Sequence, residues 1–395
     1  MERRHRWAAA LAVAIVWITP AAAGATDVSW RGLLDLMLTE HSPAFESNQL
    51  THGDDPFDPY RLRLFTDARV NDNVQFLGQL VLFDNPMGSN LYVDGAYVIY
   101  TPWLQRDLRL MAGKLPWAIG TWAPRTYSNK NPLISATLMY QYHSSLVWYA
   151  LPPNADALLA AAGTGQTGVD YFGFPMGVGM PVIDDSYWDV GVTLAGSQRP
   201  FEYALGAVAG APGWGSTAKD DNSGRSVLAR VGIAPVPALR LGMSASYGPY
   251  LSQTLDPQLP PGHSVDDYAQ KLVMADLEIE IAHVELRAEG VHNTWETPTL
   301  GDLDVDGGYG ELKVSTSSGA YLAGRFDIER FGKITSSSGD RYPWDWDVTR
   351  LEGGVGYRLT REATAKLVYQ RTVLDVPDGD DRVLSIVGGQ LSIGF

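Results

Sequence analysis

Few residues in this chain stand in patterns that could do covalent chemistry. His143 precedes Ser144 and Ser145, and serine with histidine forms the nucleophile and base of many hydrolases. Neighbouring residues of a strand point to opposite faces, so His143 and Ser144 cannot pair within one strand. The sequence also lacks the G-x-S-x-G turn that presents a nucleophilic serine. We therefore predict no enzymatic activity and keep a serine hydrolase as an alternative.

A second pattern resembles the start of a calcium-binding loop. Asp302, Asp304 and Asp306 alternate with apolar residues and precede Gly307, as in an EF-hand. The glutamate required at the twelfth position falls on Lys313, so the EF-hand prediction fails. A looser calcium site on these aspartates and an acidic outer loop both remain open. We predict no metal centre and no cofactor.

The most regular feature is charge at every second position. Arg61 and Arg63 show it, as do Asp276, Glu278 and Glu280, and apolar residues fill most positions between them. A period of two residues is typical of a strand with one polar and one apolar face. The elements that carry the charges are therefore strands.

This alternation predicts sixteen strands. Their ranges are 29–39, 60–69, 74–83, 91–100, 106–114, 187–197, 200–210, 225–234, 238–248, 270–281, 283–293, 308–317, 320–331, 347–359, 363–374 and 383–395. Strands of about 9–11 residues are long enough to cross a bilayer when tilted.

The connections between these strands alternate in length. Short ones include 70–73, 282 and 360–362, and long ones fall at 40–59, 115–186, 211–224, 249–269, 294–307, 332–346 and 375–382. A transmembrane β-barrel has short turns on one side and longer loops on the other. We therefore predict an all-β, antiparallel, up-and-down barrel, with its polar faces toward the lumen because charge is costly against lipid.

Aromatic residues cluster near both ends of the predicted strands, as in the two interfacial girdles of membrane barrels. Those on the short-turn side are Trp30, Trp103, Phe201, Tyr321 and Phe395. Those on the long-loop side are Tyr60, Tyr92, Trp188, Tyr247, Trp295, Tyr309 and Trp346.

The N-terminus has the pattern of a secretory signal. Three arginines precede an apolar run from Trp7 to Ile18, and small residues follow Pro20. These are the three regions of a signal peptide. We predict a signal over residues 1–23, with cleavage after Ala23 or Ala25, and one barrel domain over 24–395.

Composition excludes several other classes of protein. The chain of 395 residues has no cysteine, so disulfides, cysteine-ligated zinc and iron–sulfur clusters are excluded. Its net charge of −15 argues against nucleic acid as a partner.

The C-terminal strand carries a family resemblance. Val387, Leu391, Ile393 and the terminal Phe395 share one face, which resembles the last strand of Gram-negative outer-membrane proteins. With the signal and the sixteen strands, the chain resembles the sixteen-stranded porins over its whole predicted mature length. The resemblance implies an outer-membrane location, contact with lipid and lipopolysaccharide, a homotrimer, and recognition of Phe395 by the barrel-assembly machinery.

A shorter stretch, Gly113 to Gly120, resembles the phosphate-selective porin group. That group implies a basic lumen, whereas the predicted lumen of this chain has at least as many carboxylates as cations. The sequence therefore argues against selectivity for phosphate.

The longest connection, 115–186, is rich in aromatic residues, so we expect it to be ordered. The porin resemblance implies that it folds into the barrel and narrows the pore; an outer cap or a subunit-interface flap is the alternative. Its charged candidates for the constriction are Lys114, Arg125, Lys130, Asp170, Asp184 and Asp185.

Charges on the polar faces could act as a filter, because rings of side-chain charge bias permeation by sign. The basic candidates are Arg61, Arg63, Arg109, Arg230, Arg240, Arg350 and Arg358. The acidic candidates are Asp276, Glu278, Glu280, Glu285 and Glu289. Basic and acidic arcs on opposite walls would create a transverse field; the alternative is that these charges pair with one another.

The sequence thus predicts an outer-membrane porin for passive diffusion of small polar or charged solutes. A non-conducting barrel that serves as a binding or scaffold protein is the first alternative. A soluble secreted β-protein is another, which the exposed apolar faces of so many strands argue against.

Overall fold

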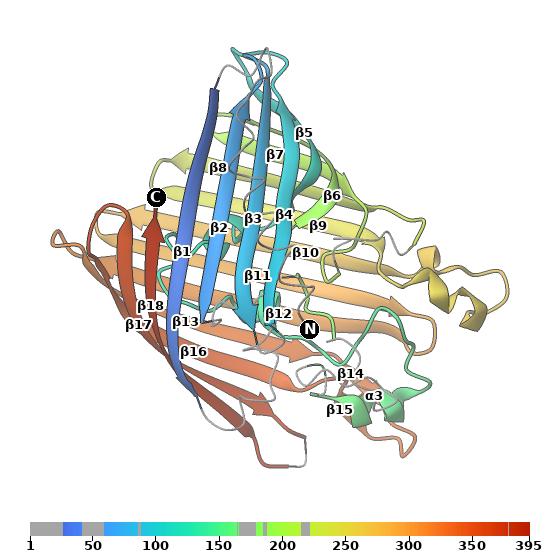
Figure 1. The fold of residues 1–395 in the computed structure, drawn as a ribbon. Coiled ribbons are helices and arrows are strands. Elements are labelled where there is room, and N and C mark those ends of the chain that lie inside the picture. Colours follow the sequence, from blue (N-terminus) through green and yellow to red (C-terminus); the bar gives the residue numbers. More distant parts are fainter. Residues whose placement is uncertain are drawn as a thin grey trace, which may run out of the picture.

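The computed structural model describes residues 27–41, 59–85, 88–163, 165, 179–184, 188–214, 222–377 and 379–395. Its strands form a closed antiparallel barrel, in which β1 pairs with both β2 and β18 (Figure 1). The sequence-based prediction of a sixteen-stranded barrel is confirmed. The predicted signal peptide and both cleavage positions lie outside the described residues.

The barrel strands match the predicted ones to within a few residues, except between β11 and β12. They are β1 (Asp27–His41), β2 (Tyr60–Arg69), β3 (Val74–Asn85), β4 (Gly88–Tyr100), β5 (Asp107–Pro116), β6 (Trp188–Gln198), β7 (Phe201–Val208), β8 (Ser226–Val236), β9 (Leu239–Pro249), β10 (Ala269–Ile281), β11 (Val284–Thr297), β12 (Gly301–Ser315), β13 (Ala320–Phe331), β16 (Asp347–Arg358), β17 (Ala363–Asp375) and β18 (Arg382–Gly394).

The connections hold short elements of their own. These are η3 (Ala123–Thr126), α2 (Leu138–Gln141), α3 (Ala155–Ala161), η5 (Gln253–Gln258), η6 (Val265–Asp267), and the hairpin of β14 (Lys333–Thr335) and β15 (Arg341–Pro343). No helix in the described part of the chain is long and apolar enough to span a membrane.

The two faces of each strand differ in polarity and exposure. On β13, Leu322 and Phe326 are 63% and 50% exposed, whereas Arg325 and Asp327 are 1% and 0% exposed. Because the barrel is closed, the exposed apolar face lies outside and the buried polar face lies inside. This inverts the usual arrangement of a soluble protein and fits an apolar surrounding.

The prediction of a long connection at 294–307 is wrong. β11 runs to Thr297 and β12 begins at Gly301, so only three residues join them. Alternation continues through this stretch, with Leu303 and Val305 buried and the aspartates between them exposed. The aspartates suggested a loop because they are polar, but they lie on the outer face of a strand. The short–long alternation also fails between β3 and β4, which two residues connect.

The girdle prediction holds for some aromatics and is wrong for others. Trp30, Trp103 and Phe201 are more than half exposed, as girdle residues should be. Trp295 and Tyr309, by contrast, are buried and share the inner faces of β11 and β12 with buried polar side chains. These two rings contribute to a core inside the barrel.

Candidate pore

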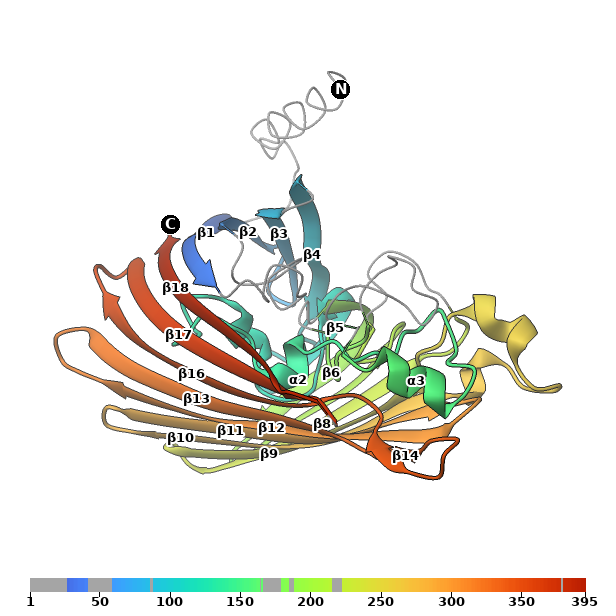
Figure 2. The same cartoon turned by 90° about the horizontal axis from the view of Figure 1, so that it is seen from below.

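The connection from β5 to β6 supplies much of that core. We call residues 117–146 the β5–β6 segment; it contains η3 and α2, and Figure 2 shows α2 between the strands of the two sides of the barrel. Trp122 is fully buried and stacks on Tyr140, with ring centroids 5.7 Å apart. Its ring also meets Tyr309 of β12 edge-on at 5.9 Å. Aromatic contacts of this kind join the segment to the inner wall.

Carboxylates of the wall accept hydrogen bonds from the segment. Glu289 of β11 accepts from the backbone and hydroxyl of Thr121 and, at 2.9 Å, from the hydroxyl of Tyr140. Glu352 of β16 accepts from the backbone N–H groups of Ile134 and Ser135 at 3.1 and 3.2 Å. These bonds satisfy backbone donors that irregular chain leaves unpaired inside the barrel.

Cations of the wall donate to the carbonyl oxygens of the same segment. Lys366 of β17 donates from Nζ to the carbonyls of Ser128, Asn131 and Leu133 at 2.5, 2.7 and 3.0 Å. Arg350 of β16 donates to the carbonyl of Ala136 at 3.1 Å and to the side chain of Gln141 at 2.7 Å. Charge-assisted hydrogen bonds are among the stronger ones in proteins, so these contacts fix the path of the segment.

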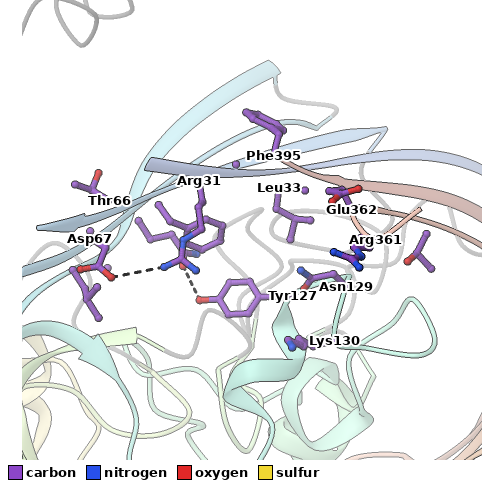
Figure 3. A pocket seen from close by; sticks show the side chains of 18 of the residues that line it. Arg31, Leu33, Thr66, Asp67, Tyr127, Asn129, Lys130, Arg361, Glu362 and Phe395 are labelled. Carbon is purple, nitrogen blue, oxygen red and sulfur yellow. Dashed lines mark hydrogen bonds and ion pairs between the residues drawn. The ribbon is translucent and has the colours of Figure 1, made fainter. Parts of the chain in front are cut away.

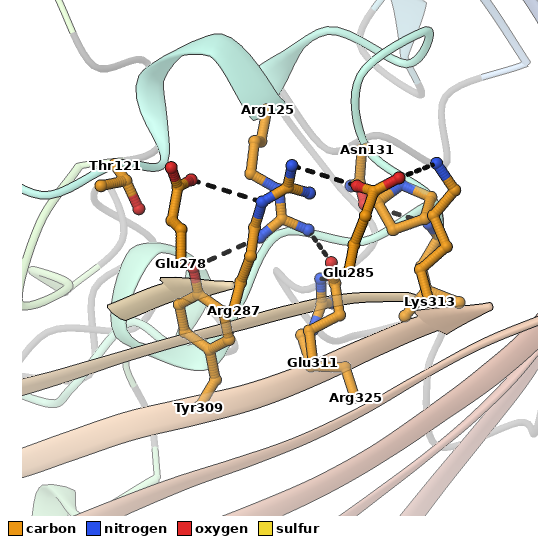
Figure 4. Close-up of polar contacts among 12 residues, drawn as sticks. Thr121, Arg125, Asn131, Glu278, Glu285, Arg287, Tyr309, Glu311, Lys313 and Arg325 are labelled. Carbon is orange, nitrogen blue, oxygen red and sulfur yellow. Dashed lines mark hydrogen bonds and ion pairs between the residues drawn. The ribbon is translucent and has the colours of Figure 1, made fainter. Parts of the chain in front are cut away.

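A buried charge cluster lies where the segment meets β12, β13 and β16. Arg325 donates to Glu352 at 2.6 Å and to Asp327 at 3.2 Å, and its Nη1 lies 3.5 Å from Glu311. Arg125, in η3 of the segment, forms an ion pair with Glu311 (Figure 4). Each charge here is buried and has an opposite partner, which is the condition for charges to be tolerated in a protein interior.

The acidic candidates of β10 and β11 are largely paired with cations. The ion pairs are Arg230–Asp276, Arg240–Glu278 at 3.2 Å, Arg287–Glu278 at 3.3 Å, Arg287–Glu285 at 3.1 Å and Lys313–Glu285 at 2.7 Å. Figure 4 shows the series of ion pairs that runs from Glu278 through Arg287 and Glu285 to Lys313. The structure therefore does not show a separate acidic arc on these strands. Neighbouring strands place opposite charges side by side, and the charges pair.

The two basic candidates of β2 are buried on its inner face. Arg63 lies 3.4 Å from Asp35 of β1, and its guanidinium carbon lies 5.7 Å from the ring centroid of Tyr127 in the segment. Arg61 lies over the ring of Phe83 at 6.0 Å. The structure thus brings these arginines toward the segment from β2, which β1 and β18 separate from β17 with its Lys366.

The remaining candidates are dispersed. Arg109 forms an exposed ion pair with Asp107 at 3.1 Å, and Glu280 is exposed near the β10–β11 turn. Lys114, a predicted constriction residue, belongs to strand β5. Its ammonium group donates to the carbonyl of Val93 at 2.7 Å. Asp184 precedes β6. Asp170 and Asp185 lie outside the described residues.

The contacts of the residues suggested for a serine hydrolase or a calcium site give these two alternatives little support. His143 Nδ1 lies 2.5 Å from the carbonyl of Gly179, and burial lowers the pKa of His143. Ser144 donates to the carbonyl of Met180 at 2.9 Å. On β12, Asp304 accepts from Thr294 and Asp306 lies 2.8 Å from His292. Within the described ranges, no group of three acidic or histidine side chains is placed to hold a metal ion.

Sequence reasoning missed several contacts of the segment. Asp35, Glu311 and Glu352 were not singled out as site residues, although each lies on an inner face. The alternation within β1, β12 and β16 was the available signal, since it assigns every second residue to the lumen. What it could not supply is the partner that each side chain meets.

Open space remains on one side of the segment. A cavity of about 780 Å³ lies between the segment and β1–β4, and Figure 3 shows it with Tyr127 in its centre. Its lining includes Arg31 and Asp67, whose charged groups lie 3.7 Å apart. Most polar contacts of the segment are thus to β11–β17, whereas Tyr127 reaches the other side of the space, where its hydroxyl donates to Gln79 of β3 at 2.7 Å.

Asp345, in the connection before β16, predicts a dependence of stability on pH. Its carboxylate accepts backbone hydrogen bonds from Ser145, Gly163 and Trp346 at 2.5, 2.7 and 2.7 Å. Burial nevertheless raises the pKa of Asp345 from 3.8 to about 6. The folded protein then holds this proton more tightly than the unfolded chain, so stability falls by roughly 3 kcal/mol as pH rises from about 4 to about 6.

Urea unfolding followed across that pH range measures this effect. We expect Asp345→Asn to flatten the fall, because asparagine does not titrate. Asp340→Asn, which changes an exposed residue of the same connection, is the control and should keep the wild-type profile. A wild-type profile in the Asp345→Asn variant would contradict the assignment.

Comparisons with known proteins support the fold. No protein-family model matches the chain, and no curated protein matches it in sequence. Solved structures do match: an anion-selective porin from Comamonas acidovorans has a TM-score of 0.56 at 10% identity and covers 93% of this chain and 99% of its own. The outer-membrane channel DcaP of Acinetobacter baumannii has a TM-score of 0.54 at 11% identity, covering 95% and 99%.

OmpF of Salmonella typhi, in complex with daunomycin, matches with a TM-score of 0.56 at 10% identity and covers 93% of this chain and 97% of its own. At these identities the likeness defines the fold. The chain has the sixteen-stranded barrel fold of outer-membrane porins and channels.

Proposed function

We propose that this chain is a porin of a Gram-negative outer membrane, which forms a water-filled channel for passive diffusion of small polar or charged solutes. One observation carries the proposal: a closed barrel with an exposed apolar outer face holds, beside its inner wall, a cavity of about 780 Å³ lined by charged and aromatic side chains. A catalytic role is not part of the proposal.

The β5–β6 segment is the constriction in this proposal. Its hydrogen bonds to Glu289, Glu352 and Lys366 hold it across the inner wall, and the free cross-section is what remains toward β1–β4. Solutes would pass beside Tyr127, along the residues of β1–β4 that line the cavity. A rigid constriction of this kind gives a size limit without a moving gate.

The proposal includes the expected partners. Trimeric association, contact with lipopolysaccharide, and assembly through the C-terminal strand follow from the porin resemblance. Phe395 exchanges two backbone hydrogen bonds with Gly32 of β1, at 2.7 and 3.0 Å, and the residue is 68% exposed. An exposed residue beside the pairing of β1 with β18 is accessible to an assembly factor.

Swelling of proteoliposomes in isotonic solutions of uncharged sugars tests the proposal. A diffusion pore predicts swelling that slows as the sugar grows from a monosaccharide to a trisaccharide. Migration on a gel with and without heating shows whether the barrel is folded in the same preparation. Folded protein without swelling would contradict the porin proposal and favour the binding or scaffold barrel.

A further inference from the structure

The cations of the lumen differ in whether they are paired. Lys313 is bound to Glu285, and Lys366 donates to three carbonyl oxygens. In the part of the chain that the structure describes, Lys130, Arg358 and Arg361 form no ion pair. All three are exposed, and all three line the cavity described above.

A second, smaller cavity adjoins the first. It measures about 180 Å³, and Lys130, Arg358, Asn129 and Thr364 line both cavities. The smaller cavity has no acidic residue in its lining, and the hydroxyl of Ser128, which also lines it, is buried without a hydrogen-bond partner. Lysine, arginine, amide and hydroxyl donors gathered around one space are the groups that bind a carboxylate, sulfonate or phosphate.

The larger cavity has two acidic residues in its lining, Asp67 and Glu362. Asp67 accepts from Gln75 at 2.7 Å and faces Arg31, and Glu362 accepts from Thr360 at 3.1 Å. Figure 3 places Lys130, Asn129 and Arg361 together on one side of Tyr127, and the Arg31–Asp67 pair on the other side. Four cations, Arg31, Lys130, Arg358 and Arg361, face these two carboxylates in the lining, so the net charge of the cavity is positive.

The same cavity has an apolar surface. Leu33, Phe65, Tyr97 and Tyr127 line it, and the rings of Phe65 and Tyr127 lie 5.5 Å apart in an edge-on contact. Sites for organic molecules combine an apolar, often aromatic, surface with a few polar groups that fix orientation. A bare inorganic ion would leave this surface unused.

From these contacts we infer an organic-anion site at the short-turn end of the barrel, near the β12–β13 and β16–β17 turns. The acid group of the ligand meets Lys130 and Arg358, with Asn129 and Thr364 beside them, and its apolar body lies along Tyr127 and Phe65. The inference deepens the proposed function by assigning a solute class to the channel, small organic anions with an apolar body. It does not require that the barrel conduct.

Calorimetric titration of the folded, detergent-solubilised protein tests the site directly. The probes are potassium benzenesulfonate and potassium methanesulfonate, which stay ionised and differ in the apolar body. We expect tighter binding of benzenesulfonate, and roughly tenfold weaker binding in Lys130→Gln/Arg358→Gln, because each charge-assisted hydrogen bond is worth more than its neutral counterpart. Lys333→Gln/Arg341→Gln removes equal charge from the exposed β14–β15 hairpin and should bind as the wild type does.

The outcomes separate the site from the channel. Binding that is absent, or equal in the wild type and in Lys130→Gln/Arg358→Gln, would overturn the site even in a conducting protein. Equal affinity for the two probes would overturn the organic-anion assignment. Binding with the expected loss, in a folded protein that does not conduct, would support the site and overturn the porin function. The single variants Lys130→Gln and Arg358→Gln decide the matter if the double variant does not fold.

Discussion

Replacing Arg325 with methionine is expected to lower the free energy of unfolding by about 3–5 kcal/mol, the range for breaking a buried ion pair from one side. Arg325 is fully buried, and its guanidinium lies between the carboxylates of Glu311, Asp327 and Glu352. Methionine is apolar and has similar length, so the loss would come from carboxylates left without their counter-charge. It also removes two hydrogen bonds to the carbonyls of Ser135 and Ala136 in the β5–β6 segment.

Urea unfolding, followed by the loss of the compact form on a gel, measures the change. Arg330→Met is the matched control on the same strand, because Arg330 is exposed on the outer face and pairs with Asp347 alone, at 3.3 Å. Exposed pairs contribute about 0–1 kcal/mol, so the control should be near wild type. Equal losses in the two variants would contradict the buried cluster as a source of stability.

Replacing residues 121–137 with a flexible glycine–serine linker is expected to give the largest change in transport. The replacement removes Trp122, Arg125 and the backbone groups that bind Lys366 and Glu352, and leaves the wall strands intact. Conductance of a water-filled pore grows with its open cross-section, so we expect it to about double or more. The size limit for sugars should rise in parallel.

Replacement of residues 260–263 by glycine and serine is the control for this experiment. That stretch belongs to the β9–β10 connection, and its residues are exposed. It should leave conductance near the wild-type value. If the 121–137 replacement folds and its conductance is unchanged, the β5–β6 segment is not the constriction.

Much of this fold is encoded locally. Alternation of polar and apolar residues is a property of neighbouring positions, and it located the barrel strands because burial inside and exposure outside differ so sharply. The error at β11–β12 has the same origin. The outer face of a barrel strand is usually apolar, but here it carries Asp302, Asp304 and Asp306. The polar and apolar faces are therefore exchanged, and the alternation with Leu303 and Val305 is mistaken for a loop.

The contacts of the site depend on information that alternation lacks. Register decides that Arg230 meets Asp276, and it places charges of three strands, β8, β9 and β10, side by side. The path of the β5–β6 segment decides the partners of Glu289 and Lys366, which lie more than a hundred residues away in sequence. Both are long-range properties, and a pattern within one strand cannot predict them.

Single-channel recording in a planar bilayer tests the central claim most directly. Purified wild-type protein, shown to be folded by its heat-dependent migration, is added on one side at low concentration. We predict stepwise increases of current to stable levels that scale with salt concentration. Folded, membrane-inserted protein that produces no steps would contradict the claim that this barrel is a channel.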